Sequence, residues 1–172
     1  MASINYYFGD KETLFHEVIR RRMEPFHLSR LERLTSLEER AAGRVLTLQE
    51  ILDAFISPML EIGLDADGKC TLFLKLMERS FIEKSFLPPK MPPSIFEECR
   101  RRFDEAFIRA LGEKMDLDDI IWRVRFTMDL VHQVMLAQDA RPMPHEEKKP
   151  FDISLLKKRL IAYASAGFQA SV

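Results

Sequence analysis

Side chains that could carry out acid–base or nucleophilic chemistry are scattered along this chain of 172 residues. No nucleophile motif stands near any of the four histidines, and the two cysteines, Cys70 and Cys99, lack partners at metal-ligand spacing. The six glycines form no phosphate-binding loop, and no helical His-Glu zinc motif occurs. The histidines are His16, His27, His132 and His145. This pattern predicts a protein that is not an enzyme and that holds no metal or cofactor.

The charge balance of the chain argues against partners that bind through a general electrostatic attraction. Lys and Arg number 26 against 27 Asp and Glu, so the formal net charge is −1. Such a chain has no global field that would attract nucleic acid or a membrane surface, so any nucleic-acid contact has to be local. Apolar residues make up 47% of the sequence but never run unbroken for the ~18–20 residues of a membrane span, and no signal-peptide pattern is present. We therefore expect a cytoplasmic protein without membrane contacts.

The spacing of apolar residues predicts an all-α protein, because they recur at three and four positions rather than at two. Asp10 is placed to cap a first helix, and Pro25 is expected to kink or end it. A second helix is predicted over "LSRLERLTSLEER", continuing towards Gly43. Thr47 and Glu50 have the spacing of a capping box, and a regular apolar stripe follows them. The N-terminal part of the chain is therefore predicted to consist of three helices.

Further helices are predicted in the C-terminal part. The segment 70–81 is apolar on most sides, which indicates a central helix, and the four prolines of "LPPKMPP" indicate a loop after it. Ser94 and Glu97 repeat the capping-box spacing, and Gly112 is a suitable stop for the helix that they begin. Asp116 is placed to cap the next helix, and a last helix follows the polar loop "AQDARPMPHEEKKP".

The last two helices carry apolar seams with heptad-like spacing. The first of them has a second stripe, formed by Trp122, Phe126, Leu130 and Val134, so one face should pack in the chain's own core and the other against a partner. Two such helices predict a homodimer held by a four-helix bundle built from two copies. The predicted interface residues are Leu117, Ile121, Val124, Met128, Val131, Met135, Ile153, Leu156, Leu160, Tyr163 and Gly167.

The opening stretch "SINYYFGDKETLF" resembles the end of the recognition helix and the start of the next helix in TetR-family transcription regulators. The family pattern is Thr or Ser, an aliphatic residue, Tyr or Asn, any residue, His or Tyr, Phe, and then a short turn to Lys-Glu and Leu. The matching residues are Ser3, Ile4, Asn5, Tyr7, Phe8, Lys11, Glu12 and Leu14. The rest of the chain is similar to the family's C-terminal ligand-binding and dimerisation domain, notably in "TLQEILDAF", the Trp122-Arg123 pair and "LIAYASAGF".

This resemblance implies a helical bundle in two parts: residues 1–22 as a remnant of the helix-turn-helix domain, and residues 23–172 as the ligand-binding and dimerisation domain. Family members place further helices ahead of the motif, and this sequence lacks them. A recognition helix without those helices has no fixed pose in the major groove, so we expect the chain as given not to bind operator DNA. In a form that carries them, the implied DNA contacts are Ser3, Asn5, Tyr6, Tyr7 and Lys11. The alternative is that these aromatic residues pack a terminal turn.

The resemblance also implies an apolar ligand site among the helices that precede and include the first seam helix. The 13 Phe and 9 Met residues combine rigid rings with adaptable thioethers, which suits a lipophilic or aromatic effector, although each also suits a plain core. Thr127, Asp129, His132 and Gln133 could orient such a ligand, but Asp129 and Arg125 also have the spacing of an intrahelical ion pair. The candidates are Phe55, Met59, Phe73, Met77, Phe103, Phe107, Phe126 and His132.

Two functions follow from the resemblance. The first is a ligand-responsive TetR-like transcription regulator, expected to be a repressor, whose partners are a second copy of the chain, a small hydrophobic effector and, when the missing helices are present, operator DNA. The second is a natural truncated form that dimerises or binds ligand without binding DNA. Both functions depend on ligand binding in the helical core and on dimerisation through the seam helices.

Overall fold

α-Helices form the framework of the molecule. The computed structural model describes residues 11–69, 71–75, 93–112, 114–140 and 151–170. Five helices account for most of these residues, and no strand occurs in the described ranges. They are α2 (Lys11–Ala41), α3 (Leu48–Gly63), α5 (Pro93–Leu111), α6 (Leu117–Ala140) and α7 (Ile153–Gln169). The all-α class predicted from the apolar spacing is confirmed.

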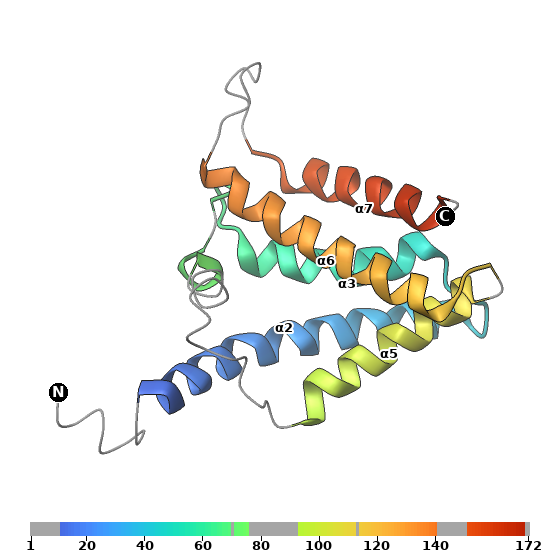
Figure 1. The fold of residues 1–172 in the computed structure, drawn as a ribbon, viewed down its shortest axis with the longest axis horizontal. Helices are drawn as coiled ribbons and strands as arrows, with labels where there is room; N and C mark the ends of the chain where they lie inside the picture. Colours follow the sequence, from blue (N-terminus) through green and yellow to red (C-terminus); the bar gives the residue numbers. More distant parts are fainter. Residues whose placement is uncertain (1–10, 70, 76–92, 113, 141–150, 171–172) are drawn as a thin grey trace.

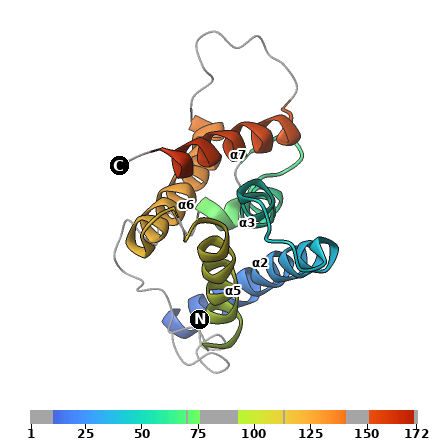
Figure 2. The same ribbon diagram turned by 90° about the vertical axis from the view of Figure 1, so that its right-hand side faces the viewer.

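Helix α3 occupies the centre of the arrangement (Figure 1). It contacts each of the other four helices, while α2 packs against α5 and α6 packs against α7. In the orthogonal view, α5 and α7 lie on opposite sides of α3 (Figure 2). The core therefore forms around α3, which has the strongest apolar character of the helices because nearly all of its faces are covered.

Helix α2 runs without a break through Pro25. The sequence pattern predicts a kink or an end at this residue and a separate second helix after it, but the helix does not end there, so the prediction of two helices is wrong. Pro25 and Arg21 are both exposed, so the Arg21 carbonyl that loses its helical partner faces water. Arg20 and Glu24, paired at 2.8 Å, stabilise the same stretch.

The start of α3 confirms the predicted capping box. The backbone N–H of Glu50 donates to the Thr47 hydroxyl at 3.3 Å, and the backbone N–H of Thr47 donates to the Glu50 carboxylate at 2.7 Å. Arg44 adds two hydrogen bonds to the same carboxylate, which lowers the pKa of Glu50 to about 2. Local sequence therefore fixes the point at which the central helix begins.

Most of the other helix ends lie close to the predicted positions, but α6 continues to Ala140, four residues into the segment predicted as a loop. Helix α5 begins at Pro93, one position before the predicted cap Ser94, because proline suits the first helical turn where no N–H partner is needed. It ends at Leu111, next to the predicted stop Gly112. Asp152 caps α7: its side-chain carboxylate accepts hydrogen bonds from the backbone N–H groups of Ser154 at 2.9 Å and Leu155 at 3.1 Å.

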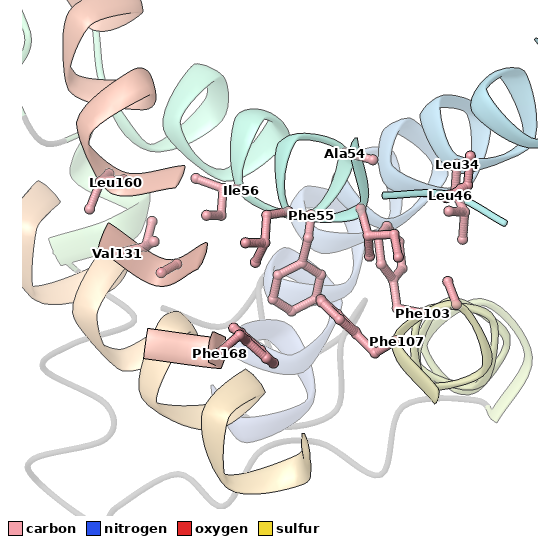
Figure 3. Packing of buried hydrophobic residues seen from close by; sticks show 14 of the residues in the cluster. Leu34, Leu46, Ala54, Phe55, Ile56, Phe103, Phe107, Val131, Leu160 and Phe168 are labelled. Atoms are coloured by element: carbon pink, nitrogen blue, oxygen red, sulfur yellow. The ribbon is translucent and has the colours of Figure 1, made fainter. Parts of the chain in front are cut away.

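Phenylalanines from three helices fill the centre of the core (Figure 3). The Phe55 ring of α3 lies 5.1 Å from Phe103 and 5.8 Å from Phe107 of α5, measured between ring centroids. Phe107 in turn stacks on Phe168 of α7 at 5.4 Å, with the two ring planes parallel. These contacts join α3, α5 and α7.

Gly63, at the end of α3, allows α3 and α6 to approach closely. A Cβ atom at this position would lie 2.7 Å from the sulfur of Met135 and 3.4 Å from a methyl group of Leu74. Met135 is fully buried at this contact. The C-terminal half of α6 is therefore held against α3, which determines which face of α6 points inward.

Candidate ligand cavity

A largely apolar cavity of about 240 Å³ lies between α2, α3, α6 and the segment 71–75. On α3 it is lined by Met59, Ile62 and Gly63, one to two turns further along the helix than Phe55, which contacts Phe107. The residues that line it are Arg22, Met23, Phe26, Met59, Ile62, Gly63, Phe73, Leu74, Met128, Asp129 and His132. Its size exceeds that of a protein cavity of about 150 Å³ that holds benzene, so a small organic molecule fits.

The structure brings three of the predicted ligand residues together: Met59, Phe73 and His132 all line the cavity. The other candidates lie elsewhere. Phe55, Phe103 and Phe107 belong to the aromatic core, Phe126 is 60% exposed on the outer face of α6, and Met77 lies outside the described residues.

None of these four described phenylalanines lines this cavity. Three of them are closed in by neighbouring side chains, and the fourth is exposed on the outer face of α6, so a ligand role for them stays a prediction. The same spacing along a helix suits both a packed core and a cavity wall.

The α2 side of the cavity is not anticipated by the sequence pattern. Met23 and Phe26 line the wall from α2, and Met128 lines it from α6. In the sequence, only the i, i+3 spacing of Met23 and Phe26 indicates that these two residues share a face of α2. The charged residues Arg22 and Asp129 are exposed at the edge, whereas His132 is half-buried. The interior of the cavity is therefore apolar, and its polar groups stand at the rim.

A buried arginine lies directly behind this wall. Arg30 of α2 is only 4% exposed, and its guanidinium lies between two rings, 4.2 Å from the centroid of Phe26 and 4.0 Å from that of Phe55. Its Nε donates to the Phe55 carbonyl at 2.8 Å, and its Nη2 contacts the sulfur of Met128 at 3.2 Å. Burial lowers the pKa of Arg30 to about 9, so the group is still charged at neutral pH.

His27, next to this arginine, is a second buried basic group. Its ring makes edge contacts with Phe26 at 5.0 Å and with Phe96 of α5 at 5.2 Å. Neither ring nitrogen has a hydrogen-bond partner among the described residues. Burial lowers the pKa of His27 to about 4, and the charge of Arg30 adds to this effect. His27 is therefore neutral at physiological pH.

Acidification is expected to destabilise the fold through His27. Its pKa is 6.5 when exposed and about 4 in the folded chain, so between these pH values the unfolded chain binds more protons and the free energy of unfolding falls as pH falls. The slope is at most about 1.4 kcal/mol per pH unit. Urea denaturation of wild type and His27→Leu between pH 4 and 6.5 measures how the free energy of unfolding depends on pH. A variant whose stability falls as steeply as that of wild type would contradict the assignment to His27.

The outer face of α6 and α7 exposes large apolar side chains. Trp122 and Phe126 of α6 are 52% and 60% exposed, with ring centroids 5.6 Å apart, and Tyr163 of α7 is 70% exposed. Arg123 donates hydrogen bonds to the Gly167 and Ala170 carbonyls, so it ties α6 to the end of α7. A groove of about 350 Å³ runs between the two helices beside these residues. Exposed aromatic side chains in such number mark an interaction surface.

The structure buries part of the predicted interface in the chain's own core. Val131, Met135 and Leu160 are 1%, 0% and 5% exposed there, while the interface itself stays a prediction. The cause on α6 is the close contact at Gly63, which turns that part of the seam inward. The remaining predicted residues are exposed or half-buried: Leu117, Ile121, Val124, Met128, Ile153, Leu156, Tyr163 and Gly167. The second stripe, with Trp122 and Phe126, forms the outer face instead.

The predicted DNA contacts cannot be compared with the structure. Ser3, Asn5, Tyr6 and Tyr7 lie outside the described residues, and so does the side chain of Lys11. The predicted boundary between residues 22 and 23 falls inside α2, which is one continuous helix. The division into two parts therefore stays a prediction.

A family model described as Tetracyclin repressor-like, C-terminal domain, matches residues 53–167. The chain belongs to this family. The match extends over about two thirds of the TetR-like chain, from the middle of α3 to the end of α7, and it includes the α3 and α6 sides of the cavity and the outer aromatic face. Arg30 and the α2 side of the cavity lie before the matched segment.

Two further findings concern the TetR-like chain. No curated protein was found that matches its sequence. None of the helices in the described ranges combines the length and the apolar character that crossing a bilayer requires.

Proposed function

We propose that this TetR-like protein is a ligand-responsive transcription regulator, acting as a repressor, whose cavity binds a lipophilic or aromatic effector. The cavity carries the proposal. It is walled by Met and Phe side chains, which adapt to and stack on apolar ligands, and its few polar groups converge at the rim. Its volume of about 240 Å³ suits a ligand the size of a small bicyclic aromatic compound or a medium-length alkyl chain.

The position of the cavity supports a regulatory role. Its walls come from α3 and α6, which lie in the matched family domain, and from α2, which precedes that domain. A ligand that contacts Met23 and Phe26 on α2 therefore acts on the helix that leads towards the N-terminus. It shifts the position of α2 only to the extent that it binds one arrangement of the helices more tightly than the other.

Filling the cavity is expected to abolish ligand binding while the protein stays folded. Met59 is a half-buried wall residue, so Met59→Trp places a larger side chain in the cavity. With the neutral fluorescent naphthalene probe prodan, we expect wild type to bind in a saturable way and Met59→Trp to bind at least about tenfold more weakly. Probe fluorescence titration measures both affinities.

Met115→Trp is the matched control for this experiment. Met115 is half-buried against the core, but it does not line the cavity, so the same substitution there should leave prodan affinity unchanged. Equal prodan binding by wild type and Met59→Trp, or none by wild type, would argue against an effector cavity at this place.

We also propose that the protein acts as a homodimer and that the outer face of α6 and α7 forms the interface. The exposed Trp122, Phe126 and Tyr163 support this, because large aromatic side chains at the centre of an interface contribute most of its binding energy. The groove between the two helices gives the face a shape that a partner helix can enter.

The transcriptional part of the proposal is tested in the organism's own cells. DNA cross-linked to the protein produced from its natural locus is recovered and sequenced, and we expect discrete enriched sites. Binding of ligand and dimerisation without any enriched site would contradict the regulator and favour the second function, a dimerising or ligand-binding protein that does not contact DNA.

A further inference from the structure

Arg30, directly behind the cavity wall, is unusual because it is a buried charged group with no opposite charge beside it among the described residues. Within the described residues, the guanidinium has one carbonyl acceptor, one thioether sulfur and two aromatic faces, and no carboxylate lies at ion-pair distance. A guanidinium carries five N–H donors, so these partners satisfy it only in part. Burying a cation in this way is costly unless it gains a counter-charge.

The other charged groups that the structure describes around the cavity do not supply that counter-charge. Arg22 and Asp129 are exposed at the rim and have opposite signs, so they roughly cancel and are screened by solvent. His27, on the same buried side of α2 as Arg30, is neutral at physiological pH and places no negative charge there. Among the described charged groups close to the cavity, Arg30 is therefore a buried positive group without a counter-charge.

We propose that the effector carries a single anionic group, a carboxylate or sulfonate, on its apolar body, and that Arg30 receives this group from behind the cavity wall. The inference rests on the proposed function of the cavity as an effector site. The flat guanidinium matches the two oxygens of a carboxylate, and such a charged pair is stronger in an apolar surrounding than in water. A second negative charge would have no partner, so doubly charged phosphate esters are disfavoured.

Met128 and Phe26 provide the route between the cavity and Arg30. Both residues line the cavity and both contact the guanidinium, so a single layer of side chains separates the two. A thioether is a weak hydrogen-bond acceptor on a flexible side chain. An incoming carboxylate oxygen replaces the Met128 sulfur at Nη2 and leaves the Nε bond to the Phe55 carbonyl in place. The Nη2 group of Arg30 thereby exchanges a weak hydrogen-bond acceptor for a negatively charged one.

Three matched probes distinguish an anionic from a neutral ligand. They are 4-phenylbutyrate, 4-phenylbutanol and 4-phenylbutylamine, which share the apolar body and differ in the head group. Isothermal titration calorimetry near neutral pH measures their affinities for the full chain. We expect the carboxylate to bind at least about tenfold more tightly than the alcohol and the amine to bind most weakly, as a charged hydrogen-bonded pair requires.

Arg30→Met tests whether Arg30 is the source of this preference. Methionine retains much of the apolar stem, and replacing a buried unpaired charge with an apolar side chain is tolerated. We expect the carboxylate and the alcohol to bind this variant with affinities within about threefold of each other. Prodan binding should be retained, which shows that the cavity is intact. Arg33→Met is the matched control, because Arg33 pairs with Glu61 away from the cavity, and it should preserve the preference of wild type.

The outcomes separate this inference from the proposed function. If the alcohol binds wild type as tightly as the carboxylate, the anionic effector is wrong while the cavity remains a ligand site. If Arg30→Met preserves the preference, Arg30 is not the receiving group and the inference is also wrong. If prodan and all three probes fail to bind wild type, the proposed effector cavity itself fails. Should Arg30→Met not fold, Arg30→Lys, which keeps the charge but loses the paired donors, must weaken the carboxylate preference.

Discussion

The double variant Trp122→Glu, Phe126→Glu is expected to be monomeric at concentrations at which the wild-type chain is a dimer. The two side chains are 52% and 60% exposed on the chain alone, and their rings contact each other at a tilt. In the proposed interface they would be buried, and two carboxylates there would lack partners. Both copies carry the change, so the dimer loses four aromatic side chains at about 2 kcal/mol each, and we expect the dissociation constant to rise by at least about a thousandfold. Sedimentation velocity over a range of concentrations measures it.

Val45→Glu is the control for this prediction. Val45 is 56% exposed in the connection between α2 and α3, away from the outer face of α6, so a glutamate there should leave the dissociation constant unchanged. A double variant that sediments as wild type, or a wild-type chain that stays monomeric at every concentration, would show that this face is not the interface.

Replacing Phe107 with alanine is expected to lower the free energy of unfolding by about 3–5 kcal/mol. The side chain is fully buried, and it contacts Phe55 of α3 and Phe168 of α7. Its removal opens a cavity at the point where three helices meet, and the surrounding helices are held too firmly to close it. Urea denaturation at a fixed protein concentration measures the loss, since dimerisation adds to the apparent stability.

Ile108→Ala provides the comparison on the same helix. Ile108 is the next residue along α5 but is 40% exposed, so its truncation should lower the free energy of unfolding by less than about 1 kcal/mol. A loss below about 1 kcal/mol for Phe107→Ala would mean that the Phe107–Phe168 stack contributes little and that the core lies elsewhere.

Local signals predicted the helical class and several helix ends. The capping box at Thr47 and Glu50 involves residues three apart, so the sequence contains all of its information. Pro25 was less predictable, because its effect on a helix depends on whether the carbonyl that it deprives of a partner faces water. That exposure is a property of the whole fold. The local capping rule therefore succeeded, whereas the proline rule, which depends on the surroundings of the helix, failed.

The direction of each apolar stripe on α6 could not be read from spacing alone. Two stripes share the helix, and both have the period of a buried face. The contact between Gly63 and Met135 determines which stripe turns inward, and these residues are far apart in the sequence. The packing of α6 against α3 therefore determines that the stripe with Trp122 faces outward.

The cavity was predictable in part. Met59, Phe73 and His132 were candidates and do line it, while Phe103 was a candidate of the same chemical type and fills the core. Composition does not distinguish a wall from a core, since both are apolar. Arg30 was not a candidate, because an arginine in "LSRLERL" has the pattern of a surface charge. Only the rings of α2 and α3 that close over it reveal its burial.

The unbroken course of α2 through Pro25 makes this helix a lever. Arg30 fastens it to α3 through the Phe55 carbonyl and thereby provides a fulcrum. The arm from that point to the start of the helix is roughly 28 Å long, at 1.5 Å per residue. A tilt of about 5° at the fulcrum displaces the far end by about 2.5 Å, so a movement too small to disturb the core becomes large at the end of the arm. In the proposed regulation, a ligand in the cavity, which Met23 and Phe26 of α2 line, would need to supply only this tilt.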